Sequence, residues 1–204
     1  MTGERLFASA VERNREPIRQ VLGGLLKETS TVLEIASGTG EHGAFFTEGL
    51  TQLTWQPSDR TDESFGSVNA WANHFGNERV LAPIVIDVTH SPPWPVGKFD
   101  ALFNANMIHI SPWVVCQGLM AGAAEHLSPN GLLLLYGPFR VNNAHTAPSN
   151  AAFDQQLRQR DPQWGVRDIE AVTEQAQRCG LAGESTIAMP SNNQIVVFRK
   201  TELR

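Results

Sequence analysis

The sequence predicts a doubly wound α/β domain with a seven-stranded, mostly parallel sheet and an antiparallel C-terminal hairpin. Short apolar stretches typical of buried strands alternate with helical stretches along most of the chain, as in a sheet covered by helices on both faces. The last two strand candidates are joined by residues 190–193 alone. Because a parallel return needs a crossover of about a dozen residues or more, these two strands must run antiparallel.

The first elements follow from apolar spacing. An amphipathic helix is expected with Pro17 in its first turn, as part of an N-terminal helical cap over residues 1–28. The nearly continuous apolar run 32–36 then predicts a buried strand. We expect a helix over 43–49 after it, and a second strand over 53–56 that ends before Pro57.

The alternation continues toward the C-terminus. We expect helices over 64–75 and 113–126, the second ending at a Ser-Pro-Asn-Gly turn, and strands over 82–88, 99–104, 132–136, 184–189 and 194–199. The polar stretch 137–167, with a helix over 149–160, interrupts this pattern. We interpret it as a lid or substrate-shaping insertion within a single domain over 1–204.

The composition is that of an ordinary globular chain. Its 204 residues are 41% hydrophobic and 18% charged, which suits one domain. A net charge of −5 and a pI near 5.7 give no overall attraction for nucleic-acid phosphates. Since no apolar run reaches the roughly 18 residues that span a membrane, both bulk nucleic-acid binding and membrane insertion are disfavoured.

The two cysteines, Cys116 and Cys179, lie far apart and form no CxxC or Cys/His spacing. This arrangement indicates neither a zinc site nor a disulfide framework. We therefore expect no metal and a reducing, cytoplasmic environment, with no export signal in the charged N-terminal stretch.

The stretch 31–43, TVLEIASGTGEHG, is the most informative motif. A buried strand runs into a glycine turn, and an acid, Glu34, stands four residues before Gly38. Gly38 and Gly40 allow a ligand to approach backbone amides near a helix N-terminus. The motif therefore predicts a pocket for a nucleotide-type cofactor.

Two cofactor classes fit these glycines. Residues 38–43 satisfy G-x-G-x-x-G, the dinucleotide pattern in which an acid about 20 residues later binds a ribose, a role for Asp59. With S-adenosylmethionine, the turn would hold the amino-acid end of the cofactor, and Glu34 would accept hydrogen bonds from its ammonium. A carboxylate beside a pyrophosphate would be repelled, which favours S-adenosylmethionine. A solvent-facing Glu34 before a plain tight turn is the remaining alternative.

Several segments give the chain a wider resemblance. VLEIASGTG, Asp59, IDV and the closing hairpin resemble the class I S-adenosylmethionine-dependent methyltransferases over nearly the whole chain, which implies a Rossmann-like sheet. More narrowly, the chain is similar to an uncharacterised methyltransferase-like family, a domain of unknown function found in bacteria and animals. The segments that carry this similarity are ERNREPI, VLEIASGTGEH, TWQPSD, NANMIHISPW, YGPF, SNAAFD and WGVRD.

The resemblance implies a cofactor site built from the strand ends. Asp59 would accept hydrogen bonds from both ribose hydroxyls, because a carboxylate makes strong charge-assisted bonds to neighbouring donors. Asp87 and Val88 would frame the adenine, although Asp87 also suits a plain turn. The residues assigned to the methionine moiety are Glu34, Ala36, Ser37, Gly38 and Gly40.

Two further segments complete the implied cofactor site. Asn104, Asn106 and Met107 follow a strand at the topological switch point, where open α/β sheets bind ligands, although Met107 also suits core packing. Asn14 and Arg15 match the N-terminal ERN segment and would close over the cofactor's carboxylate. A solvated helix face is the alternative for these two residues.

The catalytic candidates are His109 and Tyr136. His109 follows the fourth strand and titrates near neutral pH, so it is the first candidate for a base, with a packed, hydrogen-bonded histidine as the alternative. Tyr136, the only tyrosine, would orient an acceptor or else be an ordinary buried tyrosine. The lid candidates for binding a small polar or anionic acceptor are Arg140, His145, Ser149, Asn150, Asp154, Trp164 and Arg167.

The leading hypothesis is S-adenosylmethionine-dependent methyl transfer to an unidentified small molecule. Because the sulfonium already activates the methyl carbon, positioning and exclusion of water supply much of the barrier reduction, and a base is not obligatory. An NAD-dependent oxidoreductase is the second hypothesis, supported by GTGEHG. A noncatalytic cofactor-binding or protein-interaction module is the third, since no obligatory catalytic group can be named.

Overall fold

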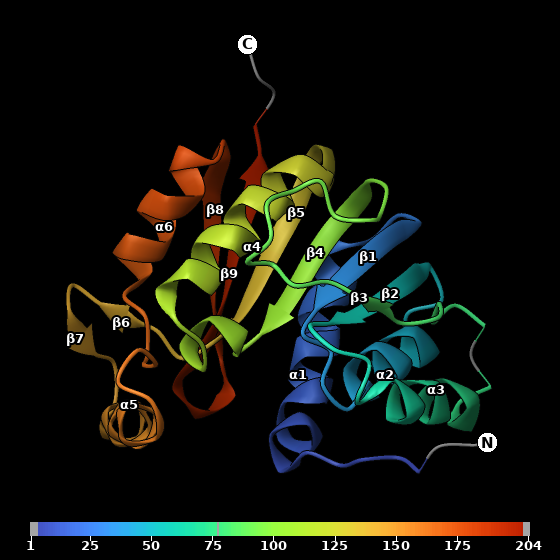
Figure 1. Cartoon of the computed structure of the whole chain (residues 1–204), viewed down its shortest axis with the longest axis horizontal. Helices are drawn as coiled ribbons and strands as arrows, with labels where there is room; N and C mark the ends of the chain where they lie inside the picture. The colour runs from blue at the N-terminus through green and yellow to red at the C-terminus, as the bar shows by residue number, and fades with distance from the viewer. Residues whose placement is uncertain (1–3, 77, 202–204) are drawn as a thin grey trace. The chain divides into compact units, whose positions relative to one another are not determined.

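One seven-stranded sheet runs through the computed structural model, which describes residues 4–76 and 78–201 (Figure 1). In spatial order its strands are β3 (Ile84–Val85), β2 (Leu53–Asp59), β1 (Ser30–Ile35), β4 (Phe99–Ala105), β5 (Leu127–Gly137), β9 (Asn193–Lys200) and β8 (Leu181–Met189). β2 is parallel to β1 and β3, whereas β9 is antiparallel to β5 and β8. The predicted fold class, with its antiparallel hairpin, is confirmed.

The chain forms two compact units. Unit 1 comprises Met1–Asp87 with Phe99–Phe103, and unit 2 comprises Val88–Lys98 with Asn104–Arg204. The organisation as a single domain stays a prediction, and residues 1–3 of the predicted N-terminal cap lie outside the described residues.

Unit 1 contains α1 (Ser9–Leu25), α2 (Glu41–Gly49) and α3 (Phe65–His74). The expectation that Pro17 opens the first helix is wrong, because α1 begins two turns earlier and holds Pro17 in its interior. A proline there removes one backbone hydrogen bond, so the helix depends on its buried face, where Ile18 and Leu22 are fully covered.

The core of unit 1 is an aromatic cluster between α2 and the sheet. The ring centroids of Phe46, Trp55 and Phe103 lie 5.5 to 5.8 Å apart. α2 approaches the sheet closely at Gly43, where a Cβ atom would lie 2.4 Å from the indole of Trp55. This close packing holds the start of α2 in place above β1 and β2.

Two strands of unit 1 differ from the expectation. β2 does not end before Pro57 but continues to Asp59, because a proline ends a strand only where its missing N–H is needed for the ladder. The strand expected over 82–88 is reduced to Ile84–Val85. As a result, Ser58 and Asp59 belong to the strand end itself.

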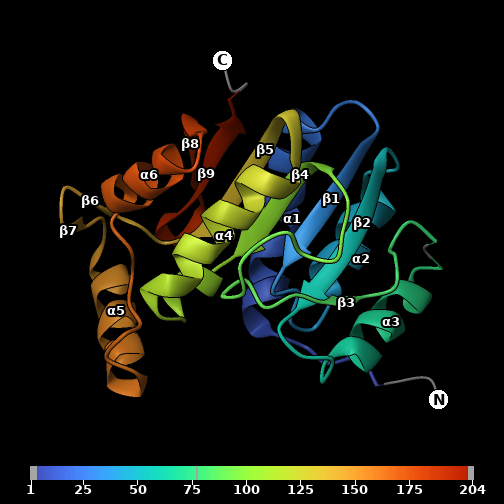
Figure 2. The same cartoon turned by 45° about the horizontal axis from the view of Figure 1, so that its top comes forward.

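Unit 2 contains α4 (Trp113–His126), as predicted, followed directly by β5, which includes the expected turn at 128–131. The predicted lid holds α5 (Pro148–Arg160) and an unpredicted hairpin, β6 (Arg140–Val141) with β7 (Ala144–His145), which lies beside α5 (Figure 2). The helix α6 (Ile169–Arg178) was also not predicted, and short 3-10 turns occur at Met107–His109 and Pro190–Asn192.

The hairpin β6–β7 closes through Asn142 and Asn143, both with positive φ (51° and 61°). Asparagine tolerates this conformation better than most residues, and two such residues make the tight turn that suits an antiparallel pair.

No helix within 4–76 or 78–201 is long and apolar enough to cross a membrane. Over the same ranges, no group of three or more His, Cys, Asp or Glu side chains is arranged to hold a metal ion. Cys116 and Cys179 are free thiols.

Candidate functional site

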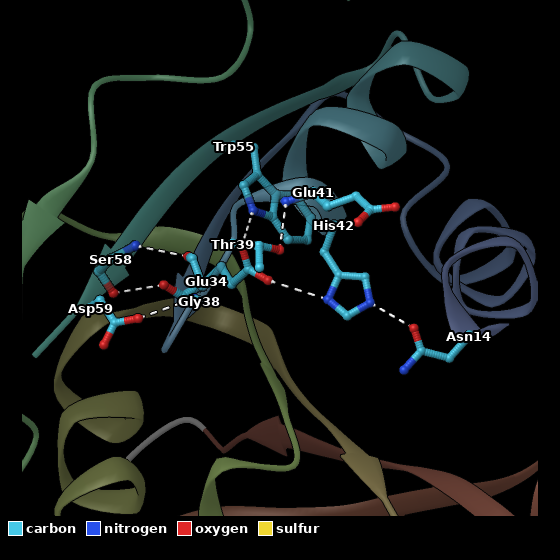
Figure 3. A network of polar contacts seen from close by, with 10 residues as sticks. Asn14, Glu34, Gly38, Thr39, Glu41, His42, Trp55, Ser58 and Asp59 are labelled. Atoms are coloured by element: carbon cyan, nitrogen blue, oxygen red, sulfur yellow. Dashed lines mark hydrogen bonds and ion pairs between the residues drawn. The ribbon is translucent and has the colours of Figure 1, made fainter. Parts of the chain in front are cut away.

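The glycine turn leads from β1 into α2 and places Gly38 beside Asp59 of β2 (Figure 3). Ala36, Gly38 and Gly40 have φ values of 60°, 55° and 83°. The turn is fixed to β2 through Ser37, whose N–H donates to Ser58 O at 2.9 Å and whose Oγ accepts from Ser58 N–H at 3.1 Å. A left-handed Ala36 costs roughly 1–2 kcal/mol, and such strain is concentrated at functional sites.

The two glycines of the turn meet different surroundings. A Cβ atom on Gly40 would lie 2.5 Å from the Cα atom of Val68 in α3, whereas a Cβ atom on Gly38 would meet nothing within 4 Å. Gly40 therefore lets α3 pack against the turn. Gly38 faces open space, which is the room that the amino-acid end of a cofactor requires.

Asp59 lies beside this open space. Its Oδ2 accepts the Gly38 N–H at 3.0 Å, and its Oδ1 accepts the Arg60 N–H at 2.7 Å. Each carboxylate oxygen has two acceptor positions, so both keep one for a further donor. The arrangement fits a pair of vicinal hydroxyls next to the glycine turn.

Glu34 is buried beneath the turn, with 1% of its surface exposed, which excludes the alternative of a solvent-facing acid. Trp55 Nε1 donates to its Oε2 at 2.9 Å, and His42 Nδ1 lies 3.9 Å from its Oε1. Burial raises the pKa of Glu34 to about 7, although the bonds from Trp55 and Ser37 favour the anion.

Helix α1 contributes Asn14 and Arg15. Asn14 is 8% exposed and its Oδ1 lies 2.8 Å from His42 Nε2, so it does not belong to a solvated helix face. Arg15 forms an ion pair with the buried Glu41 in the first turn of α2 and stacks over the ring of Phe45. These contacts tie α1 to the helix that follows the glycine turn.

A second link to the glycine turn comes from the N-terminal segment and α3. Leu6 N–H donates to Ser67 Oγ at 2.9 Å, and Ser67 Oγ donates to Thr39 O at 2.8 Å. Trp71 Nε1 donates to Leu6 O at 2.8 Å. The segment around Leu6 is thus hydrogen-bonded, through one hydroxyl, to the backbone between Gly38 and Gly40.

Sequence reasoning missed His42, Trp55 and Ser67 as members of this site. His42 stands inside the GTGEHG motif, so its position was visible in the sequence. Trp55 and Ser67 had no local signal, because their roles depend on contacts with residues 21 and 28 positions away.

The remaining cofactor candidates lie around the ends of β3 and β4. Asp87 is half-buried and belongs to unit 1, and Val88 is buried in unit 2. Asn104 is 1% exposed, Met107 is half-buried, and Asn106 has a φ of 63°, with its N–H donating to Tyr136 O at 2.9 Å.

In unit 2, His109 is fully buried. Its Nδ1 accepts the Arg167 N–H at 3.2 Å, its carbonyl accepts the Gly165 N–H at 2.8 Å, and its ring packs edge-on against Phe139. A Cβ atom on Gly137 would lie 2.5 Å from Nε2, so only glycine fits there.

Burial, and then the charge of Arg167, lower the pKa of His109 to about 3. The neutral ring carries its proton on Nε2, because Nδ1 is the acceptor. To act as a base, His109 would have to give up its bond to Arg167.

The Arg167 side chain connects the C-terminal end of the lid, residues 137–167, to the segment 108–111. It donates to Ile108 O at 2.8 Å, to Gln163 O at 2.9 Å, and to Ser111 O. The Arg140 N–H donates to Arg167 O at 2.9 Å. Arg140 and His109 are therefore both hydrogen-bonded to Arg167. Tyr136 is buried in β5, the strand that ends shortly before Arg140.

Other lid candidates form a separate cluster in α5 and β7. Asp154 Oδ1 accepts from Val166 N–H at 2.7 Å, its Oδ2 accepts from Arg158 at 2.9 Å, and His145 lies 3.7 Å from the same oxygen.

Asn150 and Ser149, at the start of α5, are tied to the turn that precedes β9. Asn150 Nδ2 donates to Asn192 O at 3.0 Å, and Asn192 Nδ2 donates to Ser149 Oγ at 3.3 Å. Trp164 lies in the segment after α5, where its N–H donates to Asp161 O at 3.0 Å.

The buried histidines predict a loss of stability in acid. Burial lowers the pKa of both His42 and His109 from 6.5 to about 3. The unfolded chain thus binds more protons, so the stability that each residue contributes is present above pH 6.5 and is lost as pH falls toward 3. By pH 4.5 each histidine should have lost roughly 2–3 kcal/mol of its contribution to the free energy of unfolding. Because the pKa of Glu34 is raised, protonation of Glu34 should stabilise the fold over the same pH range and offset the loss from about one histidine.

Urea unfolding between pH 8 and 4.5 measures this loss. His109→Asn keeps an acceptor for the Arg167 N–H but does not titrate, so its acid loss should be smaller by about 2–3 kcal/mol. His90→Asn, at an exposed histidine, is the control for removing an imidazole from outside the core. Equal slopes for His109→Asn and the wild type would contradict the prediction.

The fold is similar to that of solved S-adenosylmethionine-dependent methyltransferases. An O-methyltransferase family protein from Burkholderia thailandensis superposes with a TM-score of 0.82 at 16% identity, over 96% of this chain and 58% of that one. An O-methyltransferase family 2 protein from Planctomyces limnophilus, in complex with apigenin, gives a TM-score of 0.75 at 17% identity, over 95% and 59%.

At the level of sequence, the chain belongs to the family described as "Protein of unknown function (DUF938)", whose model matches residues 5–200. It is also 31% identical, over 118 residues, to the highly reducing polyketide synthase FUM1 of Gibberella moniliformis, a match that covers 55% of this chain and 4% of that protein. The chain thus spans less than two thirds of the length of each of these proteins.

Proposed function

We propose that the protein is an S-adenosylmethionine-dependent methyltransferase that acts on a small molecule. The observation that carries the proposal is the open space at Gly38, bordered by the Asp59 carboxylate and underlain by the buried Glu34. These two acids provide hydrogen-bond acceptors, which suit a cofactor with vicinal hydroxyls and an ammonium group. When bound, S-adenosylmethionine supplies a methyl carbon already activated by its sulfonium.

In this proposal the chain's own residues divide the binding task. Asp59 accepts from the ribose hydroxyls, and Glu34 with the turn 36–40 holds the methionine end. We assign the adenine to Asp87 and Val88. Further cofactor contacts are assigned to Asn104, Asn106, Met107, Asn14 and Arg15.

The acceptor is assigned to unit 2. Tyr136 is proposed to orient the acceptor, and His109 to act as the base for an acceptor that must lose a proton. The lid side chains between residues 140 and 167 are proposed to surround the acceptor. Support for a small acceptor comes from the apigenin complex of the Planctomyces limnophilus protein. Two free thiols support a reducing, cytoplasmic environment.

A nicotinamide cofactor is the competing proposal, favoured by the G-x-G-x-x-G spacing of the turn. The acids of the site argue against it. A pyrophosphate would bring further negative charge beside the Asp59 carboxylate, whose charge already raises the pKa of Glu34.

Titration calorimetry separates these proposals. We expect the purified protein to bind S-adenosylmethionine and S-adenosylhomocysteine and to show no specific heat with NAD or NADH. Binding of the nicotinamides alone would overturn the proposal. Transfer of a labelled methyl group to members of a small-molecule library then tests catalysis, and cofactor binding without transfer to any acceptor class would favour a noncatalytic module.

A further inference from the structure

A chain of four buried side chains connects α1 to β2 beneath the glycine turn (Figure 3). Asn14 contacts His42, His42 faces Glu34, and Glu34 accepts from Trp55. All four side chains are at least nine-tenths buried. Their contacts are therefore shielded from water, and the position of each proton in the chain matters energetically.

The Asn14 contact fixes the proton of His42. An amide oxygen is only an acceptor, so His42 Nε2 must donate to Asn14 Oδ1. Burial, and then the charge of Arg15, lower the pKa of His42 to about 3, so the ring is neutral. The Nδ1 atom of His42 consequently carries no proton, and its lone pair faces Glu34 Oε1.

The surroundings of Glu34 therefore offer little to balance a negative charge. Among the residues that the structure describes, His42 is the only basic side chain within ion-pair distance of Glu34. From α1, the charge of Arg15 is paired with Glu41 of α2. Trp55 of β2 and Ser37 of the glycine turn each provide one hydrogen bond that favours the anion, whereas Asp59 of β2 adds a second negative charge.

We propose that Asn14 and His42 are positioning residues that keep Glu34 protonated in the absence of cofactor, and that cofactor binding expels this proton to solvent. The inference rests on the proposed function. The arriving ammonium remains charged, and the O–H bond of the Glu34 carboxyl breaks to leave a carboxylate and a proton in the buffer. A cation within about 4–6 Å favours the ionised acid, so direct contact with Glu34 is not required.

The first test counts released protons. Binding heats of S-adenosylmethionine are measured at pH 6, 7 and 8 in pairs of buffers with different ionisation enthalpies. Because burial raises the pKa of Glu34 to about 7, we expect the wild type to release about half a proton more than Glu34→Gln at pH 7, nearly one more at pH 6 and little more at pH 8. Glu34→Gln should lose this component, and the exposed-site control Glu63→Gln should keep it.

The second test observes Glu34 without any ligand. Infrared difference spectra should show the carbonyl stretch of a buried carboxylic acid that titrates with a midpoint near pH 7 and is missing in Glu34→Gln. Asn14→Asp places a carboxylate against His42 Nε2 and favours the imidazolium, which then pairs with an ionised Glu34. This variant should lose the band at neutral pH, whereas Asn69→Asp on the exposed face of α3 should keep it.

Trp55→Phe provides a further readout if Asn14→Asp does not fold. It removes the donor that stabilises the carboxylate, so the midpoint of the band should move to higher pH.

Cofactor binding with equal proton release by the wild type and Glu34→Gln would overturn this inference and leave the proposed function intact. No titrating band in the ligand-free wild type would do the same. No heat with either adenosyl ligand would overturn the proposed function, and the release step with it.

Discussion

Replacing Asp59 with alanine is expected to weaken S-adenosylmethionine binding by about a hundredfold or more. The variant removes a carboxylate that, under the proposed function, accepts from two ribose hydroxyls. Hydrogen bonds to a charged group contribute roughly 1.5–3 kcal/mol each, and about 2.7 kcal/mol corresponds to a hundredfold change in affinity. Titration calorimetry on folded protein measures the effect.

A loss of affinity has a second possible origin, because Asp59 also accepts the Gly38 N–H. Thermal unfolding of Asp59→Ala should therefore accompany the titration, with Glu63→Ala as a control that removes an exposed acid of the same charge. An unchanged dissociation constant would show that Asp59 does not bind the cofactor.

Gly40→Ala is expected to destabilise the protein by about 2–5 kcal/mol. An alanine there must adopt a φ of 83°, and its methyl group would lie 2.5 Å from the backbone of Val68, which cannot move as a side-chain tip can. The conformational penalty is about 1–2 kcal/mol, and overpacking adds roughly 1–3 kcal/mol. Urea unfolding monitored by circular dichroism measures the difference.

Gly38→Ala is the matched variant, since it requires a similar φ of 55° but its methyl group meets nothing within 4 Å. It should cost only about 1–2 kcal/mol of stability while weakening cofactor binding, because the methyl group enters the open space assigned to the methionine end. Equal destabilisation by the two variants would mean that the packing of α3 on Gly40 does not matter.

The sequence predicted the strands of the seven-stranded sheet, the glycine turn and the closing hairpin because these features have local or strongly periodic signals. The bounds of α4, Trp113–His126, agree with the expected helix, and the short link over 190–193 determined the antiparallel pair. In these elements, hydrophobic spacing and turn residues point to the same structure.

The features that the sequence did not reveal depend on tertiary contacts. The start of α1 at Ser9 and the passage of β2 through Pro57 both override a local proline signal. The helix α6 was within reach of pattern analysis, since its buried Val172 and Ala176 stand four residues apart on one face.

For the site, the sequence suggested Glu34 as an acid near the cofactor but gave no information on its protonation. That property depends on Trp55, His42 and Asn14, which come from another strand and two helices. Likewise, the tautomer of His109 depends on the backbone of Arg167, 58 residues later. Such roles follow only from the folded arrangement of the hydrogen bonds.

The hydrogen bonds from Leu6 through Ser67 to Thr39 have a practical consequence for protein production. An affinity tag or fusion partner ahead of Leu6 would be joined to a segment that is hydrogen-bonded to the glycine turn through Ser67, so we expect it to change the measured ligand affinities. A C-terminal tag would follow β9 instead and avoid this linkage. Binding constants should therefore be compared between differently tagged preparations before they are assigned to the native protein.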